Sequence, residues 1–259
     1  MLLNFFGITI LTDPVLFPRI GIRLPFLTIG PKRLTQPALE FHELPAIDLI
    51  LLSHAHFDHL DTRTLRCFGK QTQVVTAPRT RDLLRWTRLR RITELGWNET
   101  HRVATAAGDL LVRAFRVNHW GARLQYDNYR GYNGYIVERQ GRRVLFGGDT
   151  ALTNDFENLR DGRPSDLAIM GIGAYQPWIR VHCTPEQAIA MADMAEARFI
   201  MPVHHQTFKL SFEPFHEPIG RFSAALQKEL ARIALREIGE TFVLPSEGCV
   251  SARPHPVVK

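Results

Sequence analysis

The sequence has few cysteines and no long apolar run. Its 259 residues include three cysteines, Cys67, Cys183 and Cys249, without paired spacing, so a disulfide framework is not expected and a reducing compartment is favoured. The apolar opening of the chain is interrupted by Asp13-Pro14 and lacks the basic start and cleavage site of a signal peptide. It is also far shorter than the ~20 residues of a membrane span. We therefore expect a cytoplasmic protein whose first residues form two strands that turn at Gly7.

The sequence also lacks internal repeats, low-complexity tracts and a Gly/Ser linker. Its composition, 45% hydrophobic and 22% charged, is that of an ordinary globular protein. These features predict a single domain over residues 1–259. A chain of this length buries a sufficient core without a structural metal, so clustered metal ligands would be catalytic rather than structural.

The formal charge of +6 comes largely from arginine. One dense group comprises Arg79, Arg81, Arg85, Arg88, Arg90 and Arg91. Three of these residues, Arg81, Arg85 and Arg88, would share one face of a helix. The group could bind anionic lipid or nucleic acid, but a solvated helix face is the favoured interpretation.

Short apolar runs alternate with helical patterns along the chain. Strands are predicted at residues 47–53, 73–76, 110–117, 134–138, 143–147, 166–171 and 198–203, and helices at 62–68, 79–87, 185–197 and 219–237. The helix at 185–197 has a clear start signal, because Thr184 can cap it, Pro185 suits its first position and Gln187 completes a capping box. The strand at 47–53 is almost wholly apolar and so covered on both faces, which predicts a layered α/β architecture.

Three histidines and a carboxylate directly follow that strand. His54, His56, Asp58 and His59 offer imidazole and oxygen donors that suit zinc or a similar divalent ion. His54 and His56 can turn toward one ion, and Asp58 and His59 can reach a second. Chance would give this cluster on the order of once in a thousand chains of this composition. The cluster therefore predicts a metal site.

Further candidate ligands follow later strands. His119, Asp149 and His204 each come just after a predicted strand, and His205 is the second choice for the position of His204. A single histidine at a strand end is seldom a ligand, but its recurrence at successive strand ends after the first cluster favours one shared site.

An ordered series of motifs extends this pattern. It comprises LTDP at 11–14, GPKR at 30–33, SHAHFDHLD at 53–61, NHW at 118–120, GGDT at 147–150, GIGAYQP at 171–177, HCTPEQA at 182–188 and PVHHQTF at 202–208. In these motifs the sequence resembles the metallo-β-lactamase superfamily. Within that superfamily it resembles the branch of the N-acylphosphatidylethanolamine-hydrolysing phospholipase D and its bacterial relatives.

The resemblance implies an αββα four-layer sandwich and a site for two divalent ions, with zinc favoured. It implies that His54, His56 and His119 hold one ion, that Asp58, His59 and His204 hold the other, and that Asp149 bridges the two. The family normally has a strand before the segment that matches Leu2–Phe6. We therefore expect a start codon assigned too late, with a domain that lacks its first strand as the alternative.

The resemblance also implies a metal-dependent hydrolase that acts on a small-molecule or lipid phosphodiester through a hydroxide between the metals. Asp58 and His182 are the predicted catalytic residues, since Asp58 would orient the nucleophile and His182 would contact the substrate phosphate. His182, Trp120 and Tyr175 are predicted to bind substrate, with packing roles as the alternative. The apolar loop at 16–29 would either contact a membrane peripherally or pack over the sandwich.

Other functions remain open at this stage. A lactonase of the ascorbate-6-phosphate lactonase type is the main rival. The segment 175–182 is shorter than in the animal phospholipase and Gln206 replaces a glycine, so the resemblance does not fix the substrate. A nuclease is disfavoured without an extra domain or a long basic arm, so nucleic acid is not an expected partner. A di-iron redox protein would have a carboxylate in place of His56. A degenerate binding module would not retain all seven ligand positions. No oligomeric state is indicated.

Overall fold

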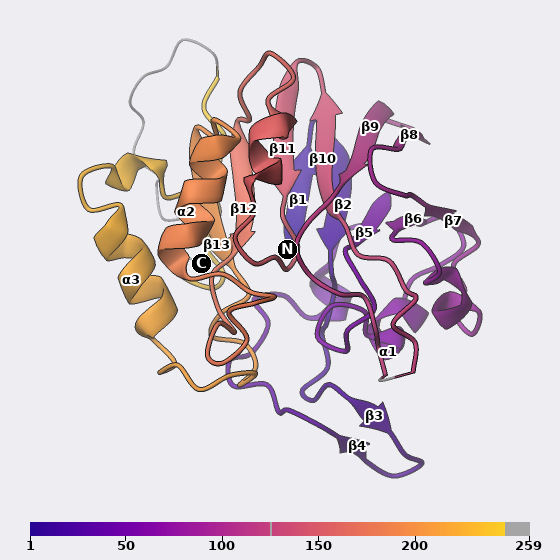
Figure 1. The fold of residues 1–259 in the computed structure, drawn as a ribbon. Helices are drawn as coiled ribbons and strands as arrows, with labels where there is room; N and C mark the ends of the chain where they lie inside the picture. The colour runs from indigo at the N-terminus through magenta and orange to yellow at the C-terminus, as the bar shows by residue number, and fades with distance from the viewer. Residues whose placement is uncertain (125, 247–259) are drawn as a thin grey trace.

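The computed structural model describes residues 1–124 and 126–246. Two sheets lie face to face, with helices on their outer sides (Figure 1). This arrangement confirms the predicted αββα sandwich. Of the three cysteines, Cys183 is buried and Cys67 exposed, whereas Cys249 lies outside the described residues.

The first sheet has the strand order β1-β2-β5-β6-β7. Its strands are β1 (Leu2–Phe5), β2 (Ile8–Thr12), β5 (Leu49–Leu52), β6 (Gln73–Thr76) and β7 (Arg91–Glu94). β1 and β2 form the predicted N-terminal hairpin around Gly7, whose φ of 82° suits glycine. β2, β5, β6 and β7 run parallel, with Ile10 opposite Leu49 and Leu49 opposite Gln73.

The second sheet has the order β13-β12-β11-β10-β9-β8. Its strands are β8 (Thr100–Thr105), β9 (Gly108–Phe115), β10 (Gly134–Arg139), β11 (Arg142–Phe146), β12 (Leu167–Gly171) and β13 (Phe199–Val203). β11, β12 and β13 run parallel, and the remaining pairs are antiparallel. A separate small hairpin, β3 (Ile22–Arg23) with β4 (Thr28–Ile29), projects beyond the sheets at the lower edge of Figure 1.

The remaining elements are helical. They are α1 (Thr62–Arg66), α2 (Pro185–Met194) and α3 (Glu217–Ala225), and the 3-10 turns η1 (Phe41–Glu43), η2 (Arg81–Leu84), η3 (Asn154–Leu159) and η4 (Leu230–Arg232). None of the helices within residues 1–124 and 126–246 combines the length and the apolar character that crossing a membrane requires.

Three apolar clusters fill the three spaces between the four layers. Because side chains alternate along a strand, Leu49 and Leu51 of β5 pack against the second sheet, whereas Ile50 and Leu52 pack outward in the cluster that contains Leu65 of α1. The third cluster joins the outer face of the second sheet to α2 and α3. β5 is therefore covered on both faces, as its apolar run predicts.

Two helix predictions were wrong in extent. The segment 79–87 forms only the 3-10 turn η2, so Arg81, Arg85 and Arg88 do not share a helix face. The Glu94 carboxylate accepts hydrogen bonds from the amides of Thr80 and Arg81, and the Thr87 hydroxyl donates to the Leu84 carbonyl. These bonds at either end limit the segment to one turn. The helix predicted at 219–237 is divided into α3 and η4.

Four strands were not predicted, namely the two-residue strands β3 and β4 and the longer strands β7 and β8. β7 and β8 lie at the outer edges of their sheets and carry many polar side chains. In β8 only Val103 is buried. Edge strands are often charged, since charge discourages pairing with other chains, and their apolar pattern is correspondingly weak.

A buried polar contact joins the two sheets where β5 ends and β10 begins. The Tyr135 hydroxyl donates to the carbonyl of Leu52 at 2.9 Å and accepts from the Asn133 amide at 3.2 Å. Tyr135 is fully buried, so no water can replace these bonds.

Replacing Tyr135 with Phe should therefore destabilise the protein by about 1–3 kcal/mol, because the Leu52 carbonyl would lose its buried donor. Urea unfolding would measure the change. Tyr129→Phe is the matched control, since Tyr129 is exposed, and should change stability by less than about 0.5 kcal/mol. Equal stability of both variants would contradict the structural role of the hydroxyl.

Candidate metal centre

The carboxyl ends of four strands place the predicted ligands together. His54, His56, Asp58 and His59 follow β5, and His119, Asp149 and His204 follow β9, β11 and β13. β9, β11 and β13 point in the same direction, so their carboxyl ends share one edge of the second sheet. All seven residues predicted as ligands fall into groups whose donor atoms lie within 4.8 Å of one another.

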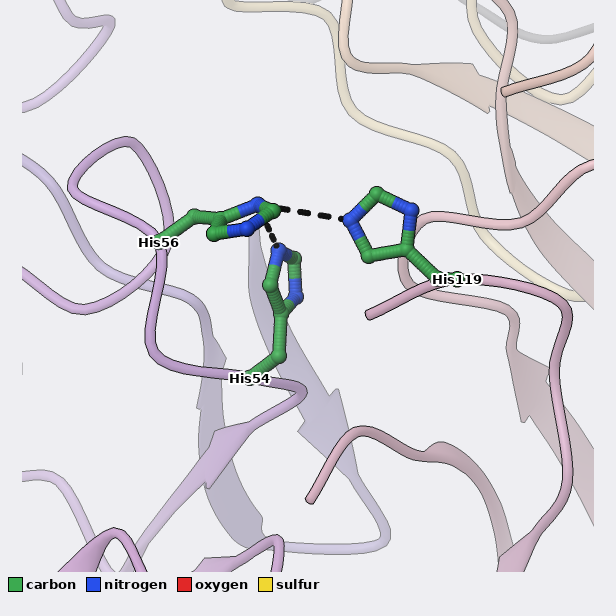
Figure 2. Close-up of side chains that lie close together, drawn as sticks. All are labelled: His54, His56 and His119. Atoms are coloured by element: carbon green, nitrogen blue, oxygen red, sulfur yellow. Dashed lines mark hydrogen bonds between the residues drawn. The ribbon is translucent and has the colours of Figure 1, made fainter. Parts of the chain in front are cut away.

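The first group consists of His54, His56 and His119. Their rings turn toward one another, with His54 and His56 on the loop after β5 and His119 from across the site (Figure 2). His54 Nε2 lies 2.8 Å from His56 Nδ1, and His119 Nε2 lies 3.3 Å from the same nitrogen. Three imidazole nitrogens in this arrangement suit a divalent ion.

The second group consists of Asp58, His59, Asp149 and His204. His204 Nε2 lies 3.2 Å from Asp58 Oδ2 and 3.3 Å from Asp149 Oδ2. His59 Nε2 lies 3.0 Å from the same Asp149 oxygen. His205, the second choice, belongs to neither group, so the geometry favours His204.

Asp149 stands between the two groups. Its Oδ2 atom lies within 4.0 Å of ring nitrogens from both sides, with His54 and His119 on one and His59 and His204 on the other. A carboxylate in this position can contact ions in both groups at once.

Residues outside the groups fix which ring nitrogen faces inward. His59 Nδ1 lies 2.6 Å from Asp13 Oδ2, and His119 Nδ1 lies 2.7 Å from the Val181 carbonyl. The Ser53 hydroxyl donates to Asp13 and faces His54 Nδ1 at 2.9 Å. With Nδ1 of His54, His59 and His119 occupied as a donor, the Nε2 lone pairs of these three histidines are left for a metal.

Burial sets the protonation of the first group. It holds the pKa of His54 well below the ordinary value, with the neighbouring histidines adding to the effect, and it lowers the pKa of His119 to about 3. The pKa of His56 is lowered by burial as well. Neutral imidazoles are the form that binds a metal.

For the two carboxylates, the neighbouring histidines outweigh burial in setting the pKa. Burial alone would raise the pKa of Asp149, but His204 and His59 hold it well below its ordinary value. His59 and His204 have the same effect on the pKa of Asp58. Both carboxylates are thus ionised, which gives the site two negative charges against which divalent cations can be bound.

The residues present fit a bound metal. Within the described residues, Asp149 Oδ2 and His59 Nε2 are buried without a hydrogen-bond partner of good geometry. Buried polar atoms normally have partners, and these two face each other at 3.0 Å. Ordinary structural hydrogen bonding does not account for this convergence, whereas metal coordination does.

The loops that carry the ligands are fixed by close backbone packing. Gly148 has a φ of 58°, and a Cβ atom there would lie 2.9 Å from Ser53 Cβ, so only glycine lets Asp149 approach the β5 loop. His204 also adopts a left-handed φ of 59°, which is strained for a non-glycine residue and typical of functional sites. Arg123 braces the β5 loop by donating to the carbonyls of Ala55 and Leu60.

Of the three predicted substrate residues, His182 and Trp120 lie beside the candidate ligands and Tyr175 does not. His182 Nδ1 lies 3.8 Å from Asp149 Oδ2, and His182 groups with His119 and Asp149 as a possible third ligand set. The Trp120 ring lies against His56 and His119, with ring centres 4.7 Å from each. Tyr175 is buried and its hydroxyl donates to Glu217, so the structure does not bring it into the cluster.

Sequence reasoning missed the residues that support the ligands. Asp13 and Ser53 occur in the motifs LTDP and SHAHFDHLD, but their contacts with His59 and His54 were not anticipated. The available signal was that each directly follows a strand, Asp13 after β2 and Ser53 after β5. Nothing in the sequence indicated Arg123 or the Val181 carbonyl.

Comparison with known proteins agrees with this geometry. The family model described as "Beta-lactamase superfamily domain" matches residues 9–205. An uncharacterized protein of Mycobacterium tuberculosis is 33% identical over 243 residues, which are 90% of this chain and 63% of that protein. The chain thus spans less than two thirds of the length of this relative.

Two further similarities are informative. The mitochondrial N-acyl-phosphatidylethanolamine-hydrolyzing phospholipase D of Saccharomyces cerevisiae is 33% identical over 222 residues, which are 82% of this chain and 47% of that protein. Igni18, a metallo hydrolase of Ignicoccus hospitalis, has a TM-score of 0.68 at 19% identity and covers 92% of this chain and 91% of its own, which shows a shared fold.

The matched segment contains the β5 loop and every strand end that bears a predicted ligand. The chain therefore belongs to the β-lactamase superfamily, the family of metal-dependent hydrolases that its motifs predict.

Proposed function

We propose that this chain is a phosphodiesterase that uses two divalent metal ions, with zinc favoured, to hydrolyse a lipid or small-molecule phosphodiester. The observation that carries the proposal is the position of Asp149 Oδ2, which lies between two separate ligand groups and within 4.0 Å of nitrogens from both. Bound divalent ions would supply Lewis acidity and a hydroxide nucleophile at neutral pH.

The protein's own residues would orient and exchange protons around this centre. Asp149 would hold the two ions at a fixed separation. Asp58 is ionised and lies on the His204 side of the site, so it can orient the attacking water and accept its proton. Trp120, which packs against His56 and His119, would form one wall of the substrate site.

His182 supports a phosphodiester as the substrate. Burial lowers the pKa of His182 to about 4, so its imidazole is neutral at pH 7 and can donate one N–H to a phosphoryl oxygen. The α2 terminus offers little competition as a donor. Thr184 and Gln187 satisfy each other's amides in the capping box, and Pro185 has no N–H.

A cavity next to His204 supports a lipid substrate. It measures about 190 Å³, and its lining includes the apolar side chains of Leu34, Phe208, Phe212 and Phe215. The similarity to a protein named for the hydrolysis of N-acyl-phosphatidylethanolamine points to the same chemical class.

The two-metal proposal predicts close to two divalent ions per chain after reconstitution, because seven ligand positions form two groups with a shared carboxylate. Elemental analysis of purified protein would measure the stoichiometry. Asp149→Asn should release at least one ion while the fold is retained. A wild-type protein that never binds more than one ion would contradict the proposal.

Asp13 should affect metal affinity through its hydrogen bond to His59 Nδ1. In Asp13→Asn the amide nitrogen must face His59, since the other carboxylate oxygen accepts the Ser53 amide at 2.8 Å. The ring would then carry its proton on the metal-facing nitrogen. We expect metal affinity to fall by roughly 10–100-fold, measured by competition with a chromogenic chelator. Asp109→Asn, at an exposed ion pair, is the control. Unchanged affinity in Asp13→Asn would exclude this role.

His182→Ala should keep the metals and reduce turnover of bis(4-nitrophenyl) phosphate by roughly 10²–10³-fold, the range for loss of one oxyanion donor. A lactone is neutral until it is attacked, so its hydrolysis should depend less on His182. His101→Ala on β8 is the matched histidine control. If phosphodiester turnover were unchanged, His182 would be a packing residue and the preference for phosphodiesters would lose its main support.

A further inference from the structure

The β3–β4 hairpin carries a concentration of exposed apolar side chains. Ile22 lies opposite Ile29, and the Leu24 amide bonds to the Leu27 carbonyl at 2.8 Å, so these four side chains share one face. Ile29 and Leu27 are 56% and 54% exposed, and Phe26 at the tip is 100% exposed. An apolar face of this kind on a projecting hairpin marks an interaction site.

The charged residues within the hairpin segment, residues 14–39, are all of one sign. Arg19, Arg23 and Lys32 are exposed, and no acidic residue occurs between Asp13 and Glu40. Arg23 pairs with Thr28 on the face opposite the apolar one. An apolar face and tip with a cationic border fit the boundary between the acyl chains and the headgroups of an anionic bilayer.

The hairpin is held firmly to the body of the protein. Arg63 of α1 donates to the Thr28 hydroxyl at 3.1 Å and to the Arg19 carbonyl, and its guanidinium lies 4.7 Å from the Phe17 ring centre. The same side chain bonds Asp61 at 3.0 Å. Asp61 follows the ligand loop directly, so the hairpin and the metal centre share one support.

The base of the hairpin also reaches the cavity beside His204. Arg33 lies over the Phe208 ring at 4.7 Å, and the Leu34 amide bonds to the Thr207 carbonyl at 2.8 Å. Leu34 and Phe208 both line that cavity. A lipid held at the hairpin would therefore lie next to the cavity beside His204.

We propose that the β3–β4 hairpin inserts its apolar face and Phe26 into an anionic phospholipid bilayer, while Arg19, Arg23 and Lys32 contact the headgroups. A bilayer accounts for features that a flat partner surface would not, because it can surround a projecting tip and bind cations on its flank at the same time. The inference extends the proposed function by naming a membrane as the place where the substrate is met, but the binding itself does not depend on catalysis.

The test is sedimentation of the full chain with phosphatidylcholine vesicles, with and without phosphatidylglycerol. The wild type should bind, and more strongly to the anionic vesicles. Phe26→Ser and the double variant Leu24→Ser/Leu27→Ser should each bind at least roughly tenfold more weakly, because each loses apolar surface that insertion into the bilayer would bury. Arg23→Gln/Lys32→Gln should lose the preference for anionic lipid.

Trp86→Ser is the matched control, because Trp86 is 71% exposed and lies outside the hairpin. It should bind vesicles like the wild type. Wild-type protein that ignores vesicles, or equal binding by Phe26→Ser, would overturn the inference. So would self-association in vesicle-free solution that Phe26→Ser abolishes, since the hairpin would then join two copies of this chain.

Two further measurements separate this inference from the proposed function. Phe26→Ser should hydrolyse the soluble substrate bis(4-nitrophenyl) phosphate at the wild-type rate, and Asp149→Asn should bind vesicles like the wild type. Vesicle binding without any phosphodiesterase activity would contradict only the proposed function. Soluble activity without vesicle binding would contradict only the role of the hairpin.

Discussion

One carboxylate oxygen governs the arrangement of the centre. Asp149 Oδ2 lies within 4.0 Å of ring nitrogens from His54, His59, His119, His182 and His204, although it is buried. So many donors gathered in a dry interior would be costly if the fold had no cation to place there, since buried polar atoms need partners. The requirement to bring these side chains to one oxygen explains why four different strands end at the same place.

The sandwich meets this requirement through packing far from the metals. Apolar alternation on β5 and β11 fixes each sheet's register, and a register shift by one residue would turn every ligand-bearing loop away. At the strand ends that bear the candidate ligands, polar contacts replace apolar ones. Tyr135 ties the end of β5 to the second sheet, and Ser53 links Asp13 to His54. The metal ligands therefore depend on supports that belong to both sheets.

The sequence predicted the parts of this structure that are encoded locally. The buried strand β5, the cap of α2 and the position of each ligand after a strand all follow from short patterns of residue types. The edge strands β7 and β8 and the single turn of η2 do not follow from short patterns. They depend on bonds between segments distant in sequence, such as those that the Thr80 and Arg81 amides donate to Glu94. For the same reason, the histidine cluster predicted which side chains would converge, whereas the acceptors for their outer nitrogens emerged only once distant segments were placed. Tyr175 shows the limit of motif reasoning, since its hydroxyl turns to Glu217 on α3.

Charge placement, rather than net charge, distinguishes the two basic regions of the chain. The arginine group at 79–91 has acidic residues close by in sequence, because Asp82 lies within it and Glu94, just beyond it, accepts the amides of Thr80 and Arg81. Several of its side chains also have local partners, such as the Trp86 ring beneath Arg85 and the Thr87 carbonyl bound by Arg90. The hairpin has the opposite composition, with cations beside exposed apolar residues and no acid nearby in sequence. Because Arg63 bonds both Thr28 of this hairpin and Asp61, which follows the candidate ligand loop, the hairpin proposed to bind lipid and the candidate metal centre share one support.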